Sequence, residues 1–134
     1  MAHAGQELQG PGGTRLRLLE TGEDLLAMEA AYAGKGSMPP EHLHPRQAER
    51  FEVLEGAMLT IVGGAERRYE KGEVFHVPAG TPHQMRADGR TRVRWEVRPA
   101  LRTAEFFEAL YSGKVTDGAA FLRDFADEFR LTGD

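Results

Sequence analysis

The sequence contains no cysteine. Disulfide bonds and thiolate metal ligands are therefore excluded, and any metal ion must be held by histidine, aspartate, glutamate or water. The chain also lacks an excess of positive charge, since its formal net charge is −4. Nucleic-acid-binding domains carry clustered basic charge, so we expect no nucleic-acid partner.

Long apolar runs are missing as well. No stretch of roughly eighteen apolar residues occurs, and the N-terminal sequence MAHAGQELQGPGGT lacks the apolar core of a signal peptide. We therefore expect a cytoplasmic protein without a membrane partner. Residues 1–13, rich in glycine and polar side chains, predict a flexible N-terminal arm.

The remaining pattern is typical of a single all-β domain. A chain of 134 residues fits one domain, so we assign 1–134 to one unit. Over 14–101, short segments alternate apolar and polar residues, which is typical of half-buried antiparallel strands. Gly63-Gly64 and Asp88-Gly89 indicate tight turns between them. The spacing predicts a sandwich or barrel.

One segment conflicts with this pattern. EDLLAMEAAYA is rich in alanine, and Asp24 stands where a helix N-cap would, so local propensity favours a helix. The neighbouring segments require a strand instead. We predict a strand over 24–33.

The C-terminal residues 102–134 change to helical spacing. Apolar side chains recur at intervals of three and four residues, with Thr103 and Asp117 as candidate caps and Gly133 as a stop. We predict two short helices whose phenylalanines pack on the outside of the barrel or on another subunit. Together with the apolar strand at 15–20, this extension predicts a homodimer.

The segment GSMPPEHLHPRQAERFEVLEG, from Gly36 to Gly56, places two histidines around one leucine. Residues i and i+2 of a strand point to the same face, so His42 and His44 can present two imidazoles to one ion. Glu49 can return on the next strand, and His83 follows the turn sequence PAGTP. Three imidazoles and a carboxylate suit one divalent transition metal (Fe, Mn, Ni, Co or Zn) and suit Ca or Mg poorly.

These residues resemble the two sequence motifs of the cupin superfamily. The first motif, with its HxH pair and following glutamate between two glycines, is filled from Gly36 to Gly56. The second is filled from Gly72 to His83, but Ala87 stands where the motif has asparagine. The sequence is similar to small single-domain bacterial cupins with a C-terminal helical extension.

The resemblance implies a double-stranded antiparallel β-barrel of the jelly-roll type. It also implies that the metal is bound inside this barrel by the four matching residues, which are His42, His44, Glu49 and His83.

Further side chains are candidates for the wall of the cavity. We expect inward-facing positions near the metal to make it largely apolar. The candidates are Phe51, Met58, His76, Met85 and Trp95. A lone histidine such as His76 is more often simply accommodated than functional. Gln47 is uncharged, so we expect it in the loop and not on the metal.

Such a site supports two interpretations. In the first, the protein is a metal-dependent enzyme of the dioxygenase or isomerase/cyclase type, acting on a small organic substrate by oxygenation or by proton transfer (isomerisation, epimerisation or cyclisation). Glu49 would then double as the catalytic base. In the second, the protein binds a small molecule without turnover, as a sensor does. Convergent polar groups in a pocket favour the enzyme.

Overall fold

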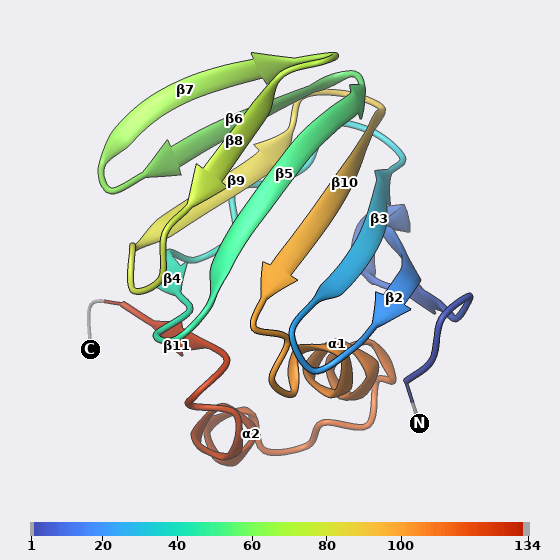
Figure 1. Cartoon of the computed structure of the whole chain (residues 1–134), viewed down its shortest axis with the longest axis vertical. Coiled ribbons are helices and arrows are strands. Elements are labelled where there is room, and N and C mark those ends of the chain that lie inside the picture. Colours follow the sequence, from blue (N-terminus) through green and yellow to red (C-terminus); the bar gives the residue numbers. More distant parts are fainter. Residues whose placement is uncertain (1, 133–134) are drawn as a thin grey trace.

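The computed structural model describes residues 2–132 and contains two antiparallel β-sheets that face each other (Figure 1). The first sheet has the strand order β1 (Glu7–Gln9), β2 (Arg15–Thr21), β3 (Leu26–Tyr32), β10 (Thr91–Arg98), β5 (Ala48–Glu55) and β8 (Val74–Val77). The second has the order β11 (Arg130–Leu131), β4 (His42–Leu43), β9 (His83–Ala87), β6 (Ala57–Val62) and β7 (Ala65–Glu70). This arrangement confirms the predicted jelly-roll class.

The core fills the space between the two sheets. Along β5 the side chains alternate between buried and more accessible positions, so Glu49 shares the inward face with Phe51 and Val53. The neighbouring strand β10 buries Val93 and Val97 on the same side. A carboxylate is thus held inside an otherwise apolar layer.

Strand β3 confirms the prediction of a strand over 24–33. Its residues pair with β2 on one side and β10 on the other, with Met28 opposite both Leu18 and Trp95. Ala27, Met28 and Ala30 are fully buried. Pairing with two neighbours and burial in the core outweigh the helix propensity of the alanines.

The N-terminal segment corrects the prediction of a flexible arm over 1–13. Residues Glu7–Gln9 form β1 on the edge of the first sheet, and a 3-10 turn follows at Pro11–Gly13. Leu8 is buried, and the Gln6 side-chain amide donates to Glu108 at 2.8 Å. These contacts order a segment that is too polar to build a core of its own.

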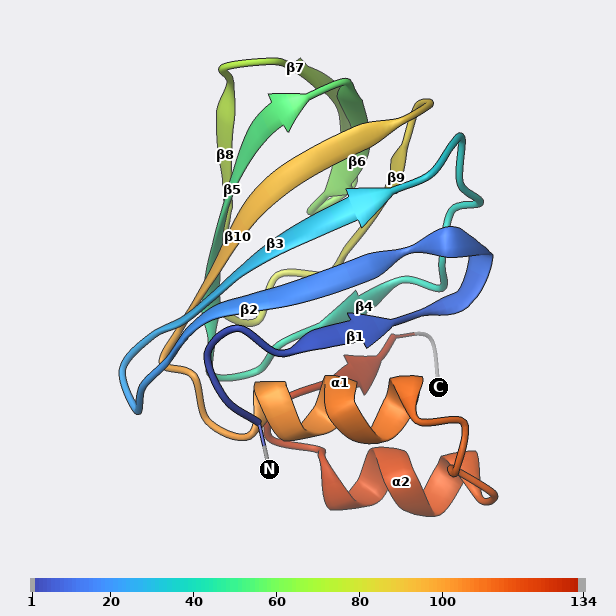
Figure 2. The ribbon, with the colours of Figure 1, turned by 90° about the vertical axis from the view of Figure 1, so that its right-hand side faces the viewer.

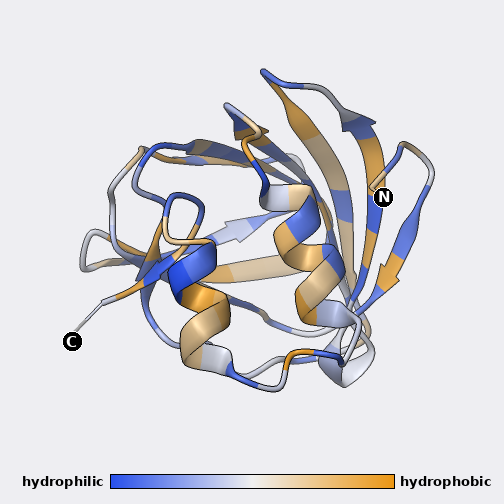
Figure 3. Cartoon of the chain, turned by 90° about the horizontal axis from the view of Figure 1, so that it is seen from below, coloured by the Kyte–Doolittle hydropathy of each residue, from blue (hydrophilic) through white to orange (hydrophobic). Residues whose placement is uncertain are grey.

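Helices α1 (Thr103–Tyr111) and α2 (Gly118–Asp124) lie across one end of the sheets (Figure 3). The Asp117 side chain accepts a hydrogen bond from Ala120 N, as predicted for a cap, whereas the N-cap position of α1 is Arg102 and not Thr103. Gly133, expected to stop the second helix, lies outside the described residues, and α2 already ends at Asp124. Within residues 2–132 no helix has the length and hydropathy needed to cross a bilayer.

After α2 the chain returns to the second sheet. Strand β11 pairs with β4 in a register that sets Leu131 opposite His42 and Arg130 opposite Leu43. Figures 1 and 2 both show β11 beside β4, at the end of the molecule where the helices lie. The C-terminal residues therefore reach one of the histidines of the first motif.

Steric crowding explains why the first motif ends in a glycine. Gly56 has φ of +79°, and a Cβ placed on it would lie 2.4 Å from the carbonyl oxygen of Arg90. Only glycine fits this left-handed turn between β5 and β6 without moving the backbone.

Candidate metal centre

Three histidines of the second sheet converge between the two sheets. His42 on β4 is the direct partner of His83 on β9, and His44 immediately follows β4. One ring nitrogen from each histidine lies within 4.8 Å of the other two. These three imidazoles could hold a metal ion.

Glu49 reaches the same point from the opposite sheet. Its Oε1 atom lies 3.2 Å from Nε2 of His44 and 3.1 Å from Nε2 of His83. The glutamate is 3% exposed and His83 is 1% exposed, so the cluster is closed to bulk water on this side. The two sheets together bring all four residues predicted from the motifs to one place.

Each histidine is oriented through its Nδ1 atom. An Nδ1–H that donates to a backbone carbonyl leaves the Nε2 lone pair directed into the site, which is the usual arrangement around protein-bound metals. The three Nδ1 contacts are His42 to Pro40 O at 3.1 Å, His44 to Glu128 O at 2.7 Å and His83 to Thr81 O at 2.9 Å.

Charge and burial set the protonation of the cluster. Burial, followed by the neighbouring His83, lowers the pKa of His42 to about 4. Burial alone would raise the pKa of Glu49, but its bonds to His44 and His83 outweigh this effect and lower that pKa to about 2. Burial opposes a proton on His44, yet the Glu49 carboxylate raises the pKa of His44 above its ordinary value. At neutral pH the site thus contains a carboxylate and a neutral His42.

Two of the four buried side-chain atoms that lack a hydrogen-bond partner in the described part of the chain belong to this cluster. Among residues 2–132, neither Nε2 of His44 nor Oε1 of Glu49 makes a well-aligned hydrogen bond, although the two atoms are close together. Buried polar atoms are nearly always satisfied, so these two indicate a further group at this point. A cation bound by both atoms would satisfy them, and the donor set therefore fits a divalent transition metal.

A cavity of about 750 Å³ opens from the histidines towards the helices and the N-terminal turn. Phe51, Met85 and Trp95 line it, together with the four motif residues. Two of the predicted wall residues do not line it. Met58 is fully buried in the core, and His76 points away from the core on β8 with an exposed side chain.

Trp95 makes a polar contact that the alternation of apolar and polar residues in the sequence did not predict. Its Nε1 atom donates to Oε2 of Glu49 at 2.7 Å, while Oε1 of this carboxylate faces the histidines. The indole stacks on Phe51 with 5.4 Å between ring centroids. Trp95 therefore fixes the orientation of Glu49 towards the histidines.

The C-terminal aromatic residues correct a second expectation. Phe106, Phe107 and Phe129 line the cavity, where packing on the outside of the barrel or on another subunit was predicted. Phe129 stacks on the His42 ring with 4.7 Å between centroids and 20° between planes. Helical spacing identifies an apolar face, but it does not say that this face closes the cavity.

Gln47 lies in the loop before β5, as expected. Its amide nitrogen donates to the carbonyl oxygens of Pro99 and Ala100 and to Oγ1 of Thr103. The side chain is 1% exposed and ties this loop to the start of α1. Gln47 therefore fixes the loop beside the site and is not part of the histidine cluster.

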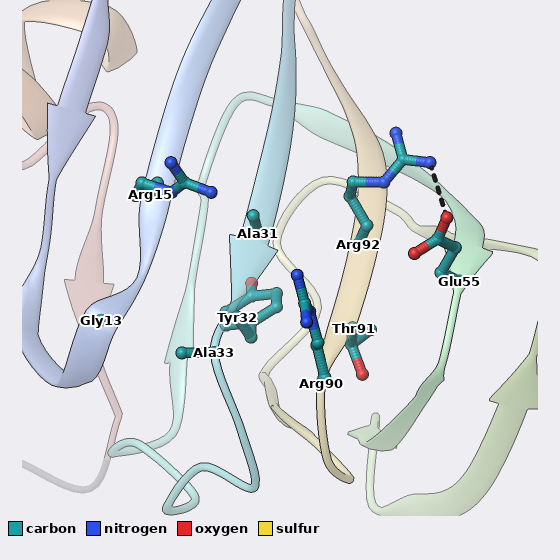
Figure 4. A pocket seen from close by; sticks show the side chains of 9 residues that line it. All are labelled: Gly13, Arg15, Ala31, Tyr32, Ala33, Glu55, Arg90, Thr91 and Arg92. Carbon is teal, nitrogen blue, oxygen red and sulfur yellow. Dashed lines mark hydrogen bonds and ion pairs between the residues drawn. The ribbon is translucent and has the colours of Figure 1, made fainter.

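A second pocket, of about 440 Å³, lies near the ends of β3 and β10 (Figure 4). Arginines 15, 90 and 92 line it, and Arg92 is ion-paired with Glu29 and with Glu55. It contains no histidine and no second acidic group beside Glu55. We therefore place the candidate site in the larger cavity.

Comparison with known proteins identifies the family. The cupin domain family matches residues 28–97, just over half of the chain, and this range contains all four motif residues. Quercetin 2,3-dioxygenase from Bacillus subtilis is 39% identical over 54 residues, which make up 40% of this chain and 16% of that protein. The match thus spans about a sixth of that relative's length.

Two solved structures share the fold. An RmlC-like cupin from Shewanella frigidimarina has a TM-score of 0.67 and 21% identity, over 77% of this chain and 96% of its own. KdgF from a Halomonas species has a TM-score of 0.64 and 23% identity, over 70% of this chain and 86% of its own. The chain belongs to the cupin family.

Proposed function

We propose that this protein is a metal-dependent enzyme that acts on a small, mainly apolar organic substrate. One divalent transition metal (Fe, Mn, Ni, Co or Zn) would be held by His42, His44, Glu49 and His83. The reaction would be an oxygenation or a proton transfer of the isomerisation, epimerisation or cyclisation type. The observation that carries this proposal is the convergence of three imidazoles, each fixed through Nδ1, beside a cavity, with Nε2 of His44 and of His83 next to a buried carboxylate.

The metal would supply chemistry that these reaction classes share. A bound divalent metal supplies a Lewis acid that lowers the pKa of a coordinated oxygen or of the adjacent C–H group. The relative named quercetin 2,3-dioxygenase, 39% identical over 54 residues, supports oxygenation as one of these reactions. The four residues that would hold the metal line the cavity, so a substrate bound there would lie beside it.

The residues of the chain would act on the substrate in three ways. Glu49, with its pKa lowered to about 2, is ionised at neutral pH and can accept a proton from a substrate atom beside it. Trp95 holds the carboxylate in one orientation through its 2.7 Å bond. The aromatic wall, with Phe51 and Phe129 among its members, binds an apolar ring and excludes water from the reacting atoms.

A second candidate is a binding protein without turnover. The Trp95 bond favours it, since a carboxylate whose Oε2 accepts from Trp95 and whose Oε1 faces two histidines has less freedom to move a proton. The same cavity would then capture an apolar molecule.

The test begins with metal analysis of the purified protein. Metal-loaded protein is then incubated with diketones, phenols and polycyclic aromatic compounds, with and without oxygen, and the products are separated by mass. Turnover that needs both metal and Glu49 supports the enzyme. Ligands recovered unchanged under both conditions would support the binding protein.

A further inference from the structure

Two tyrosines line the same cavity away from the histidine cluster. Tyr32 is the last residue of β3 and Tyr111 is the last residue of α1. They come from segments nearly eighty residues apart in the sequence and meet at the cavity through the fold. Neither was singled out by the motifs.

The register of the first sheet separates Tyr32 from the metal-side residues. Trp95 of β10 pairs with Met28 of β3, whereas Thr91 of β10 pairs with Tyr32 of β3. The two pairs are four residues apart on each strand. At a rise of about 3.3 Å per residue, the two levels are roughly 13 Å apart along the sheet. The backbone of Tyr32 is therefore displaced along the sheet from that of Trp95, although its side chain remains within electrostatic reach of Glu49.

Tyr111 is fixed in the opposite wall by close packing. A Cβ placed on Gly10 would lie 2.8 Å from Cζ of the Tyr111 ring, so the ring rests directly on the N-terminal turn. The ring also packs edge-on against Phe107 at 5.6 Å, and Phe107 packs edge-on against Trp95 at 5.2 Å. An aromatic wall thus connects Tyr111 to the carboxylate of Glu49.

The two hydroxyls are placed as hydrogen-bond donors. Within residues 2–132, neither hydroxyl makes a hydrogen bond to a protein group, and neither oxygen is among the fully buried unpartnered atoms, so both hydroxyls remain accessible to a bound molecule. Burial raises the pKa of Tyr111, and burial followed by Tyr111 and Glu49 raises the pKa of Tyr32. Both phenols consequently keep their protons at neutral pH.

We propose that Tyr32 and Tyr111 form a second polar subsite, which donates hydrogen bonds to an oxygen at the end of the substrate remote from the histidines. The substrate class is then a planar aromatic compound with oxygen atoms at both ends. One end carries the oxygens for the metal, the ring lies along Phe107 and Trp95, and the other end carries a hydroxyl or carbonyl. The cavity of about 750 Å³ accommodates a molecule of two or three rings. This inference rests on the proposed function, since it takes the histidines as the metal side.

The test uses two flavonols as probes. 3-Hydroxyflavone and quercetin share the same chelating hydroxyl and ketone, but quercetin carries further hydroxyls on its outer rings. Their affinities for Ni²⁺-loaded protein are measured by calorimetry without oxygen, so that no turnover intervenes. The variants are Tyr32→Phe and Tyr111→Phe. Tyr69→Phe is the matched control, because Tyr69 stacks on Phe75 and does not line the cavity.

The wild-type protein is expected to bind quercetin more tightly than 3-hydroxyflavone. Each cavity variant should weaken quercetin binding about three- to tenfold, which is the effect expected from losing one hydrogen bond. The affinity for 3-hydroxyflavone should stay within about twofold of the wild-type value. Tyr69→Phe should change neither affinity. If Tyr32→Phe fails to fold, Tyr111→Phe at the end of its helix carries the same comparison.

Several results would overturn the subsite. Equal weakening of both probes would assign the tyrosines a packing role only, and so would an unchanged preference for quercetin in both variants. If metal-loaded protein binds 3-hydroxyflavone without preferring quercetin, or binds neither probe, the subsite is wrong and the metal site stands. A wild-type protein that takes up no metal would overturn the proposed function together with the subsite.

Discussion

The indole Nε1 of Trp95 donates a hydrogen bond of 2.7 Å to Oε2 of Glu49, between neighbouring strands of the first sheet. The other oxygen of Glu49 faces His44 and His83 of the second sheet. One carboxylate therefore joins the aromatic wall of the cavity to the histidine cluster. Loss of either contact should change the chemistry of the site more than the stability of the fold.

Trp95→Phe should lower kcat about tenfold while metal content remains near one ion per chain. The phenyl ring keeps the contact with Phe51, but the bond that orients Glu49 is lost, at a cost of about 1 kcal/mol. Metal content and the pH profile of kcat are measured together, because the acid limb should move to higher pH when the donor is absent. An unchanged profile would show that the indole serves packing alone.

His42→Ala and His83→Ala should each reduce the metal content from about one ion per chain to less than about a tenth. Both rings contribute a nitrogen to the same cluster, so either deletion leaves too few ligands. Elemental analysis after dialysis measures the content. His76→Ala is the control, since that exposed histidine lies outside the cavity. Retention of metal by both cluster variants would refute the ligand assignment.

Glu49→Gln should separate catalysis from binding. The change keeps the shape of the side chain but removes its charge and its ability to accept a proton. We expect kcat to fall about a hundredfold or more, and substrate affinity to change by less than about tenfold. Glu52→Gln, on the same strand but on the more accessible face, is the control. Parallel losses in affinity and rate would instead show that Glu49 contributes to substrate binding and not to the chemical step.

Phe129→Ala should weaken metal binding several-fold, because Phe129 stacks on His42 beside β11. The same truncation should cost roughly 3 kcal/mol of stability. Phe121→Ala is the matched control, since Phe121 packs on Phe106 and Phe125 without lining the cavity. It should destabilise the protein and leave the metal affinity unchanged. Equal metal affinity in both variants would contradict a role for Phe129 at the site.

The metal-free protein should lose stability as pH falls from about 6.5 to about 4. The folded pKa of His42 is lowered to about 4, so over this window the unfolded chain binds a proton that the folded chain does not. The loss due to His42 is at most about 3 kcal/mol. Below pH 4.5 Glu49 adds a further loss as pH falls towards its folded pKa of about 2.

Urea unfolding of the chelator-treated protein between pH 4 and 7.5 measures this dependence. His44, whose pKa is raised, acts in the opposite direction, because it stabilises the folded state below that pKa. His42→Gln isolates the contribution of His42, and its stability should fall less steeply with pH than that of the wild type. Equal slopes in the two proteins would show that His42 titrates normally.

The sequence by itself indicated the candidate ligands and the class of fold. Spacing i and i+2 on a strand gives His42 and His44 a common face whatever surrounds them, and the motif glycines mark turns such as Gly56. Period-two alternation also placed Glu49 on the inward face with Phe51. These features depend on local backbone geometry, which the sequence encodes over a few residues.

Only the tertiary structure decided what surrounds the ligands. Alternation could not show that His76 faces outward, and composition could not show that residues 7–9 gain order by pairing with β2. The carbonyl of Glu128 that orients His44 lies 84 residues away along the chain, and the Trp95 bond to Glu49 spans 46. Such contacts depend on how sheets and helices pack, because the free energy of burying an apolar face does not depend on which partner covers it. The closure of the cavity by Phe129 and α1 was therefore settled by the fold.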